Sequence, residues 1–254
     1  MSLNYRYDPD LEFLKELESE ELNDLVNLLI YDPNDNEERI SQELKECEEF
    51  RKYYPDHVKY WDKIAAELQK YGGNTFANLF RGGVGVPYRE ILMDVCDKFD
   101  VNYNKYSSTE RIEENLLMKI LKDALEKMSD EERKELLKAI GLETHTDFSA
   151  EGLFAIFQAV FRAGGFKSYQ LTVIIVNAIL KALIGRGLSL AGNAMLTRTM
   201  AILTGPIGWA ITALWTAIDI AGPAYRVTVP AVIEISYLRK KHKYKDVLKE
   251  INFN

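Results

Sequence analysis

The chain has 254 residues, of which 47% are hydrophobic and 28% are charged, and its formal net charge is −7. This length and composition predict one or two globular domains with a real core, and they exclude a disordered chain, a collagen and a small disulfide-rich protein. The two cysteines and three histidines are scattered along the chain, which predicts reduced thiols and excludes a zinc finger, a c-type haem site and an H-E-x-x-H protease.

Charge is distributed unevenly along the chain. Residues 1–150 carry 34 acidic and 20 basic side chains, whereas residues 151–226 carry 2 and 6, and residues 227–254 carry 3 and 6. The acidic first half argues against specific nucleic-acid binding. The cationic, apolar second half favours contact with an anionic membrane surface, but the alternative that the two halves attract each other and pack together stays open.

In the first half, hydrophobic spacing predicts helices. Leucines recur every three to four residues between Leu11 and Leu29. Asp8–Pro9 has the pattern of an N-cap followed by proline in the first helical turn. The pair Asp35 and Glu38 predicts the start of a helix that continues to about residue 54.

Further helices are expected downstream of Pro55. One would run to about Tyr71, and two more would begin at Ser-x-x-Glu capping boxes whose serines are Ser107 and Ser129. Gly141 stands where a glycine would end the last of these helices. In the second half, the β-branched residues 171–176 lead without a turn into 177–183, which predicts a buried helix rather than a strand.

These patterns together predict an all-α protein, a multi-helix bundle. The composition changes near residue 148, from charged and amphipathic to rich in alanine, glycine and isoleucine. We therefore expect an acidic amphipathic region at 1–147 packed against an apolar helical region at 148–254, which ends in a basic tail.

Residues 71–89 hold a cluster of glycines, which permit positive φ and close approach of backbones. The sequence has neither the G-K-[S/T] of a Walker A loop nor G-x-G-x-x-G after a strand. A tight turn between helices is favoured, and an anion-binding pocket is the alternative. The candidate binding residues are Asn74, Asn78, Arg81, Tyr88 and Arg89.

Distinctive residues occur in three parts of the chain. They are Asn4-Tyr5, Asp8, Asp10-Leu11 and Phe13-Leu14; then Trp61, Ile64-Ala65, Glu67-Leu68-Gln69, Gly72-Gly73, Ala77-Asn78, Arg81-Gly82, Gly85, Tyr88-Arg89, Ile91-Leu92 and Asp94-Val95; and finally residues 224–232. With these motifs the chain resembles the YaaW family of bacterial proteins over most of its length. A more distant resemblance, to assembly chaperones of ubiquinol–cytochrome c reductase, implies a helical fold and a membrane-protein client and supplies no catalytic residues.

Residues 199–218 are a run of 20 without a charge, just long enough to cross a bilayer as a helix, although Gly205–Pro206 interrupts it. Three alternatives follow for residues 152–233: a soluble core, a conditionally exposed membrane hairpin, or a permanent membrane segment. Asp219 is expected to pair with Arg226 or Arg198. The candidate residues for a membrane or client surface are Trp209, Trp215, Asp219, Tyr225 and Arg226.

Two charged features complete the inventory. The basic cluster at 238–245 is expected to be a solvated helix end, with weak binding to lipid or RNA phosphates as the alternative. The acidic pairs Glu113–Glu114 and Glu131–Glu132 are interpreted as solvated helix faces, and no catalytic constellation, metal site or cofactor site is predicted.

The sequence therefore predicts a non-enzymatic cytoplasmic protein, peripheral or conditional at the inner membrane. Its partner would be a membrane surface or an apolar helical client, bound through residues 152–233, and self-association into a homo-oligomer stays open. A soluble assembly chaperone or scaffold is the alternative, and an enzyme with a pocket at the glycine segment is the third candidate.

Overall fold

The computed structural model describes residues 3–32, 35–75, 85–139, 141–142, 145, 147–185, 188, 222 and 224–246. These residues form a helical bundle, as predicted, and the strand-like pairing among them is an isolated bridge between Tyr31 and Glu38. The α-helices are α1 (Asn23–Ile30), α2 (Glu48–Tyr53), α3 (Trp61–Thr75), α4 (Tyr88–Lys98), α5 (Thr109–Leu125), α6 (Asp130–Ala139), α7 (Ala150–Ala163), α8 (Gly165–Ile184) and α10 (Tyr225–Lys243). Short 3-10 helices are η1 (Glu12–Glu16), η2 (Ser19–Leu22), η3 (Leu44–Glu46) and η4 (His57–Tyr60).

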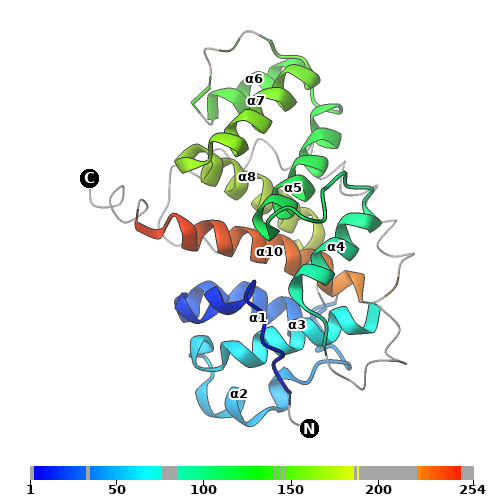
Figure 1. Ribbon diagram of the computed structural model, residues 1–254, viewed down its shortest axis with the longest axis vertical. Helices are drawn as coiled ribbons and strands as arrows, with labels where there is room; N and C mark the ends of the chain where they lie inside the picture. The colour runs from blue at the N-terminus through cyan, green and yellow to red at the C-terminus, as the bar shows by residue number, and fades with distance from the viewer. Residues whose placement is uncertain are drawn as a thin grey trace.

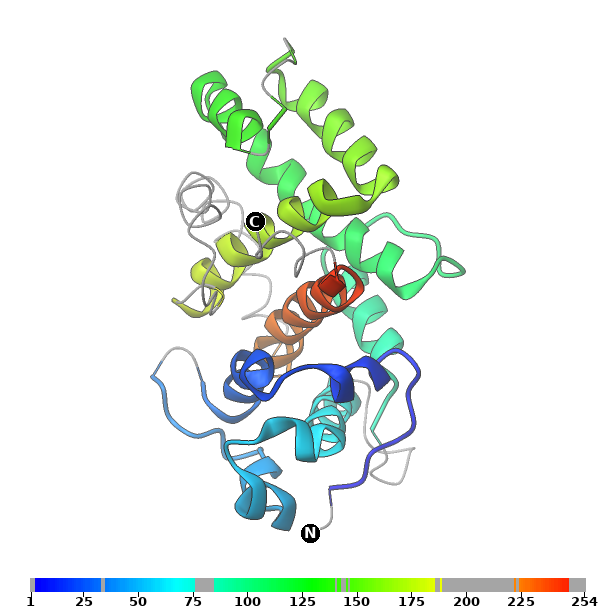
Figure 2. The same cartoon turned by 90° about the vertical axis from the view of Figure 1, so that its left-hand side faces the viewer.

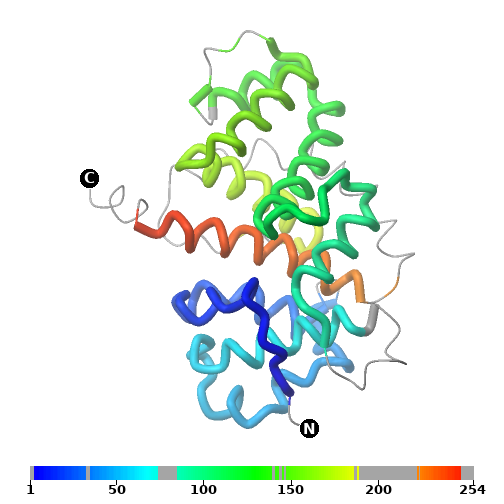
Figure 3. The backbone as a smooth tube through the Cα atoms, in the orientation of Figure 1, coloured from blue at the N-terminus to red at the C-terminus, as the bar shows by residue number. Residues whose placement is uncertain are grey.

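The last helix of the chain, α10, lies in the middle of the molecule. In Figure 1 it crosses between a lower layer made of α1, α2 and α3 and an upper group that includes α5, α6, α7 and α8. The view along α10 in Figure 2 shows helices on several sides of it, and it contacts α1, α3, α4, α5 and α8. The tube in Figure 3 shows how the chain builds both layers first and returns between them.

One hydrophobic core joins the two layers, and it extends from Leu3 in the N-terminal segment to Leu238 in α10. Because this core includes residues from both sides of position 147, neither side is completed without the other. The division at 147/148 is therefore a change in composition, and its status as a boundary between two domains stays a prediction.

Two of the predicted helix ends are confirmed. Ser129 and Glu132 form a reciprocal capping box: the Ser129 N–H donates to the Glu132 carboxylate at 2.8 Å, and the Glu132 N–H donates to the Ser129 hydroxyl at 3.2 Å. Gly141 has a φ of +67°, and its N–H donates to the Lys138 carbonyl at 3.1 Å. A glycine is favoured there because L side chains rarely adopt positive φ.

The predicted start of α5 is wrong by one residue. The N-cap is Ser108, whose hydroxyl accepts from the Arg111 N–H at 3.3 Å. Ser107 lies outside the helix and contributes its backbone carbonyl to Arg89. The Ser-x-x-Glu spacing misled because the neighbouring Ser108 has the extended backbone that an N-cap needs.

This shift gives a test of the helix start. Replacing Ser108 with alanine should lower the free energy of unfolding by about 1 kcal/mol, because the Arg111 N–H in the first turn of α5 loses its side-chain acceptor. Ser107→Ala is the matched control and should change stability by no more than a few tenths of a kcal/mol. Urea denaturation of both variants would measure the difference, and equal losses would contradict the assignment of the cap.

The helix predicted for residues 35–54 is wrong over its first part. After α1 the chain turns back on itself: the Asp32 N–H donates to the Glu37 carbonyl at 2.8 Å, and the Arg39 N–H donates to the Ile30 carbonyl at 2.8 Å. The Asp35 carboxylate accepts from the Glu37 N–H at 2.9 Å, which is the bond of an Asx turn and not of a helix cap. Only η3 and α2 are helical in this stretch.

The first helix also begins later than the Asp8–Pro9 pattern predicts. The Asp8 carboxylate accepts from the Asp10 N–H at 3.0 Å and caps a turn, and η1 begins at Glu12. The Asp8 side chain is buried because it also accepts from the Tyr88 N–H at 2.6 Å. The Asp8 carboxylate, which the sequence pattern predicted as a helix N-cap, is therefore engaged in a long-range contact with α4.

The described glycines of the 71–89 segment permit close packing. A Cβ on Gly72 would lie 2.4 Å from the Ile91 side chain, and one on Gly85 would lie 2.6 Å from the backbone of Gln69. Gln69 holds both neighbouring segments, because its side-chain amide pairs with the backbone of Arg6 and its carbonyl accepts from the Val86 N–H at 3.1 Å. At these two positions the glycines therefore serve the packing of the fold.

Candidate functional site

The apolar helix α8 is the described part of the predicted client or membrane surface that is most deeply buried. Residues 171–180 are buried without interruption, which confirms a buried helix there. By length and composition alone α8 could cross a membrane, and 78% of its most apolar window is buried inside the protein. Helices α5, α7 and α10 contact it (Figures 1 and 2). In this structure α8 is therefore core and not surface.

Helix α10 covers α8 and is itself buried on most sides, including residues 227–229 and Pro230. Near its end, however, it carries charges into the interior. The Arg239 Nε donates to both carboxylate oxygens of Glu113 on α5, at 3.1 and 3.0 Å. Its Nη2 donates to the carbonyl of Asp10 at 2.8 Å, so one guanidinium joins α10, α5 and the N-terminal segment.

Tyr88 completes this network from α4. Its hydroxyl donates to Glu113 at 2.7 Å, and its ring lies 5.5 Å below the Arg239 guanidinium. Burial raises the pKa of Glu113, although the charge of Arg239 and the Tyr88 hydrogen bond oppose the shift. Burial alone would lower the pKa of Arg239. The charge and hydrogen bond of Glu113, together with Tyr88 and Asp10, more than offset it, so the guanidinium stays charged.

The next residue of α10 makes a second buried ionic contact with α5. Lys240 donates to Glu114 at 2.6 Å and to Glu110 at 2.9 Å, and its side chain is only 4% exposed. Lys243, one turn further, also pairs with Glu110 at 2.8 Å. We call these contacts the α10 seam: Arg239, Lys240 and Lys243 of α10 with Glu110, Glu113 and Glu114 of α5.

The seam corrects two predictions. Arg239 and Lys240 are not part of a solvated helix end, and Glu113 and Glu114 are not a solvated face. Lys240, Glu113 and Glu114 are buried, and Arg239 is half-buried where it pairs with Glu113. Outer members of the basic cluster also pair with acidic residues of the first half, as Lys241 does with Glu21 at 2.6 Å. The opposite charges of the two halves therefore meet inside the protein, which was the alternative that the charge distribution left open.

The predicted binding cluster at the glycine segment is described only in part. Tyr88 is buried within the seam network, and Arg89 donates to Thr109 Oγ1 and the Lys105 carbonyl, both at 2.8 Å, and to the Ser107 carbonyl. Arg89 thus fastens α4 to the loop before α5. Asn74 lies in the last turn of α3, but its side chain lies outside the described residues, as do Asn78 and Arg81. Their assembly into one site stays a prediction.

The predicted membrane or client surface is likewise described in part. Tyr225 opens α10 and its hydroxyl bonds to Asp94 of α4; burial raises the pKa of Asp94, and this hydrogen bond lowers it in part. Arg226 follows in the same turn. Trp209, Trp215 and Asp219 lie outside the described residues, and so do the uncharged run at 199–218 and the expected Asp219 ion pair.

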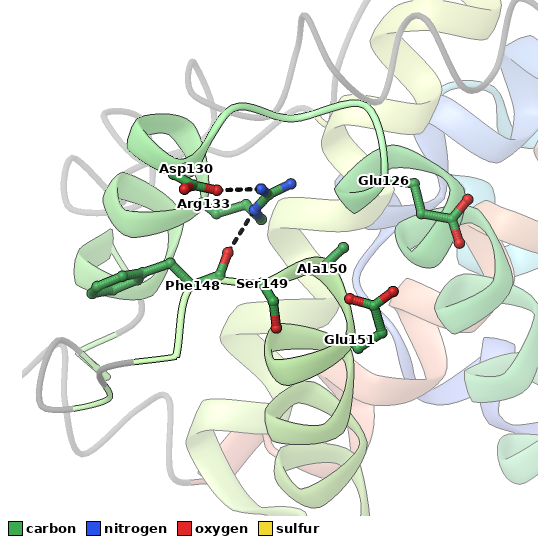
Figure 4. Close-up of a pocket in the computed structure, with 7 residues that line it drawn as sticks. All are labelled: Glu126, Asp130, Arg133, Phe148, Ser149, Ala150 and Glu151. Atoms are coloured by element: carbon green, nitrogen blue, oxygen red, sulfur yellow. Dashed lines mark hydrogen bonds and ion pairs between the residues drawn. The ribbon is translucent and has the colours of Figure 1, made fainter.

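A polar depression of about 510 Å³ lies beside the turn between α5 and α6 (Figure 4). Arg133 spans it, donating to the carbonyls of Phe148 at 2.6 Å and Leu125 at 2.8 Å and pairing with Asp130. Its donors are thus taken up by holding the α6–α7 connection to α5. Throughout the described ranges, this depression included, no group of three or more His, Cys, Asp or Glu is arranged to hold a metal ion.

The two thiols are also occupied by packing. Cys47 and Cys96 are free and buried. Burial raises the pKa of both thiols, that of Cys96 to about 12. A reactive cysteine needs a lowered pKa, so neither thiol has the surroundings of a nucleophile.

Comparison with known proteins gives a consistent set of relatives. A family model described as ubiquinol-cytochrome C chaperone matches residues 56–233, and one described as a domain of unknown function (DUF3944) matches residues 5–40. A UPF0174 protein of Helicobacter pylori (strain J99 / ATCC 700824) is 52% identical over 237 residues, which are 93% of each chain. UPF0174 protein YaaW of Escherichia coli (strain K12) is 34% identical over 246 residues, 94% of this chain and 97% of the relative. No solved structure matches.

Proposed function

This chain belongs to the UPF0174 family, which includes YaaW, and to the family described as ubiquinol-cytochrome C chaperone; we propose that it is a non-enzymatic, cytoplasmic protein that holds an apolar helical segment of a client protein. The family supports a chaperone-like role. Within residues 152–233 we assign the client to the apolar helix α8, which becomes accessible when α10 moves away from it.

The observation that carries this proposal is the way α8 is covered. Ten consecutive residues, 171–180, are buried, and the helix above them is held to α5 by the charged α10 seam as well as by apolar contacts. Buried ion pairs contribute little net stability compared with an apolar contact of the same volume, but removing one partner is costly. A cover fastened in this way can be loosened by a partner that competes for the charges.

The test is to loosen the seam and ask what the exposed helices bind. The double variant Glu110→Ala/Glu114→Ala leaves Lys240 without its two partners. It should bind a biotinylated, leucine-rich helical peptide several-fold more than the wild type in a streptavidin pull-down. Asp123→Ala is the matched control, because Asp123 pairs with Lys119 on the same helix at 2.7 Å and takes no part in the seam.

A cooperative thermal transition would verify that each variant is folded, and Lys243→Ala provides a milder opening because its side chain is 51% exposed. If folded seam variants capture no more peptide than Asp123→Ala, the proposal of a covered client surface is wrong. Equal capture by the wild type and the opened variants would also contradict it, because no opening would then be needed.

A membrane surface is the second candidate, and it is favoured by the length and apolar composition of α8. In this version the protein would associate with the inner membrane only after opening. Flotation with neutral and anionic vesicles separates the two candidates: opened variants that float but capture no peptide would favour the membrane, and the converse would favour a protein client.

A further inference from the structure

A second, more enclosed cavity lies in the lower layer, away from the seam. It has a volume of about 250 Å³ and lies between α1, the η3–α2 segment and η4. Its walls combine apolar and aromatic side chains with polar ones. They are Val26, Ile30, Tyr31, Phe50 and Tyr54 together with Asn23, Asn27, His57 and the cation Lys45, whose ammonium lies over the Tyr31 ring and pairs with Glu38. Sites for drug-sized ligands have volumes of roughly 300–1,000 Å³, so this cavity is closer in size to a single large side chain.

The aromatic walls are held in place by each other. The rings of Phe50 and Tyr54 stack with centroids 5.0 Å apart, and Tyr54 meets His57 edge-on at 5.7 Å. His57 is fixed by a hydrogen bond to Tyr60 and by one to Asn23 at 2.6 Å. Burial lowers the pKa of His57, which favours a neutral floor for the cavity. A preformed pocket loses little conformational entropy when a ligand enters it.

One wall of this cavity is unusually exposed. Tyr54 is 60% exposed, whereas Phe50 and His57 are buried. Tyrosine at the rim of a preformed pocket is typical of positions that contribute most to protein–protein binding, because its ring buries a large area while its hydroxyl stays hydrated. Asn27 lines the same cavity and offers an amide to the backbone of a bound segment.

The charge around the pocket selects the partner. Residues 18–56 carry 13 acidic and 4 basic side chains, a larger negative excess than that of the whole chain. Two of the basic groups already pair with acids of this segment, Arg39 with Asp32 and Lys45 with Glu38. Glu46 and Glu48, which flank the cavity residues in sequence, are exposed. This field attracts cations and repels anionic lipid and nucleic-acid phosphates.

We propose that this aromatic pocket binds one large apolar side chain presented by a cationic segment of a client protein. The inference rests on the proposed function only in taking the occupant to be a client. The pocket lies outside residues 152–233, so its occupation needs no opening of α10. It would hold a basic anchor of the client while the apolar helices receive a second, uncharged segment.

The test uses a fluorescein-labelled peptide of lysine and alanine with one central tryptophan, measured by fluorescence anisotropy against the full chain. Two matched peptides replace the tryptophan with serine or every lysine with glutamate. The tryptophan peptide should bind at least about tenfold more tightly than either, because both the apolar anchor and the positive charge contribute. Raising the salt concentration should weaken its binding.

Variants locate the binding. Tyr54→Ala should weaken the tryptophan peptide about tenfold, and Tyr54→Phe should retain binding because the ring remains. Tyr106→Ala is the control for loss of an exposed tyrosine elsewhere, since Tyr106 is 84% exposed. Asn27→Trp places a ring in the cavity and should also prevent binding. It tests the same cavity while Tyr54 stays unchanged.

Three results would overturn the proposal. The first is no binding of the tryptophan peptide, and the second is that the serine peptide binds as tightly as the tryptophan peptide. The third is that Tyr54→Ala and Asn27→Trp bind the tryptophan peptide as tightly as the wild type does. Its failure is distinguishable from that of the proposed function, because Glu110→Ala/Glu114→Ala should bind the tryptophan peptide as the wild type does. If the tryptophan peptide binds and the leucine-rich peptide is not captured, the aromatic pocket is supported and the covered client surface is wrong. If the leucine-rich peptide is captured and the tryptophan peptide does not bind, the client surface is supported and the pocket proposal is wrong.

Discussion

Replacing Arg239 with methionine should lower the free energy of unfolding by about 3–5 kcal/mol at pH 8, because it leaves the buried Glu113 carboxylate without its cation. The side chain of Glu113 is 3% exposed, so water cannot replace the guanidinium, and Tyr88 offers only one hydrogen bond. The variant also lacks the hydrogen bond from Arg239 to the Asp10 carbonyl, and this bond ties the N-terminal segment to α10. Chemical denaturation at fixed pH would measure the loss.

The double variant Arg239→Met/Glu113→Leu separates two effects: the loss of the contacts that Arg239 makes, and the cost of burying the Glu113 carboxylate without a cation. It removes the carboxylate together with its partner, and it should recover most of the stability that Arg239→Met loses, since apolar replacements of buried ion pairs are often neutral or stabilising. A double variant as unstable as the single one would show instead that the guanidinium matters through its contacts with Asp10 and with the Phe13 ring, 4.7 Å away. Lowering the pH should also reduce the cost of Arg239→Met, because burial already raises the pKa of Glu113 and a protonated carboxyl needs no cation.

The fold could be predicted from the sequence where local signals agree with the packing. The Ser129 capping box and the Gly141 helix end are satisfied by backbone groups within one turn, so no distant residue can displace them. The helix expected from residue 35 fails because Arg39 reaches back to the Ile30 carbonyl and to the Asp32 carboxylate. An Asx turn and an N-cap use the same residue types, and the sequence pattern does not separate them.

The α10 seam could be predicted only as a general tendency. The uneven charge distribution indicated that the halves could attract each other, but a helical pattern does not say whether a helix is covered on one side or on several. Helix α5 contacts α4, α7, α8 and α10. Glu113 is therefore buried, although the same position on an amphipathic helix with one solvated face would be exposed. The aromatic pocket could not be predicted from the sequence either, since its residues come from four separate short elements and the segments next to them.

A second buried carboxylate makes stability depend on pH. Glu67 of α3 is fully buried; one oxygen accepts from the Glu43 N–H at 3.1 Å, and the other has no hydrogen-bond partner in the described part of the chain. Lys70, whose positive charge acts on Glu67, pairs with the Glu43 carboxylate at 2.8 Å. Burial raises the pKa of Glu67 to about 7, and the charge of Lys70 and the Glu43 N–H only partly oppose this.

The sign of the pH dependence follows from that shift. The ordinary pKa of a glutamate is 4.5, so between pH 4.5 and about 7 the folded protein holds a proton at Glu67 that the unfolded chain has released. Stability therefore falls as the pH rises through this window, and above pH 7 the charged, buried carboxylate costs roughly 3 kcal/mol. Below pH 4.5 the group is neutral in both states and the cost is absent.

Glu67→Gln should remove this cost while keeping the shape of the side chain. Relative to wild type, the variant should gain roughly 3 kcal/mol more at pH 8 than at pH 4.5, because glutamine cannot ionise and every other titrating group is common to both proteins. Urea denaturation across this range, with the exposed Glu126→Gln as the control for loss of one negative charge, would measure the difference. A difference between Glu67→Gln and wild type that does not change with pH would contradict the prediction, because it would show that folding does not shift the pKa of Glu67. The expected gain is large because a buried charge with one hydrogen bond is far from compensated. Glu113 differs, since both its oxygens accept from the Arg239 Nε and one of them also accepts from the Tyr88 hydroxyl.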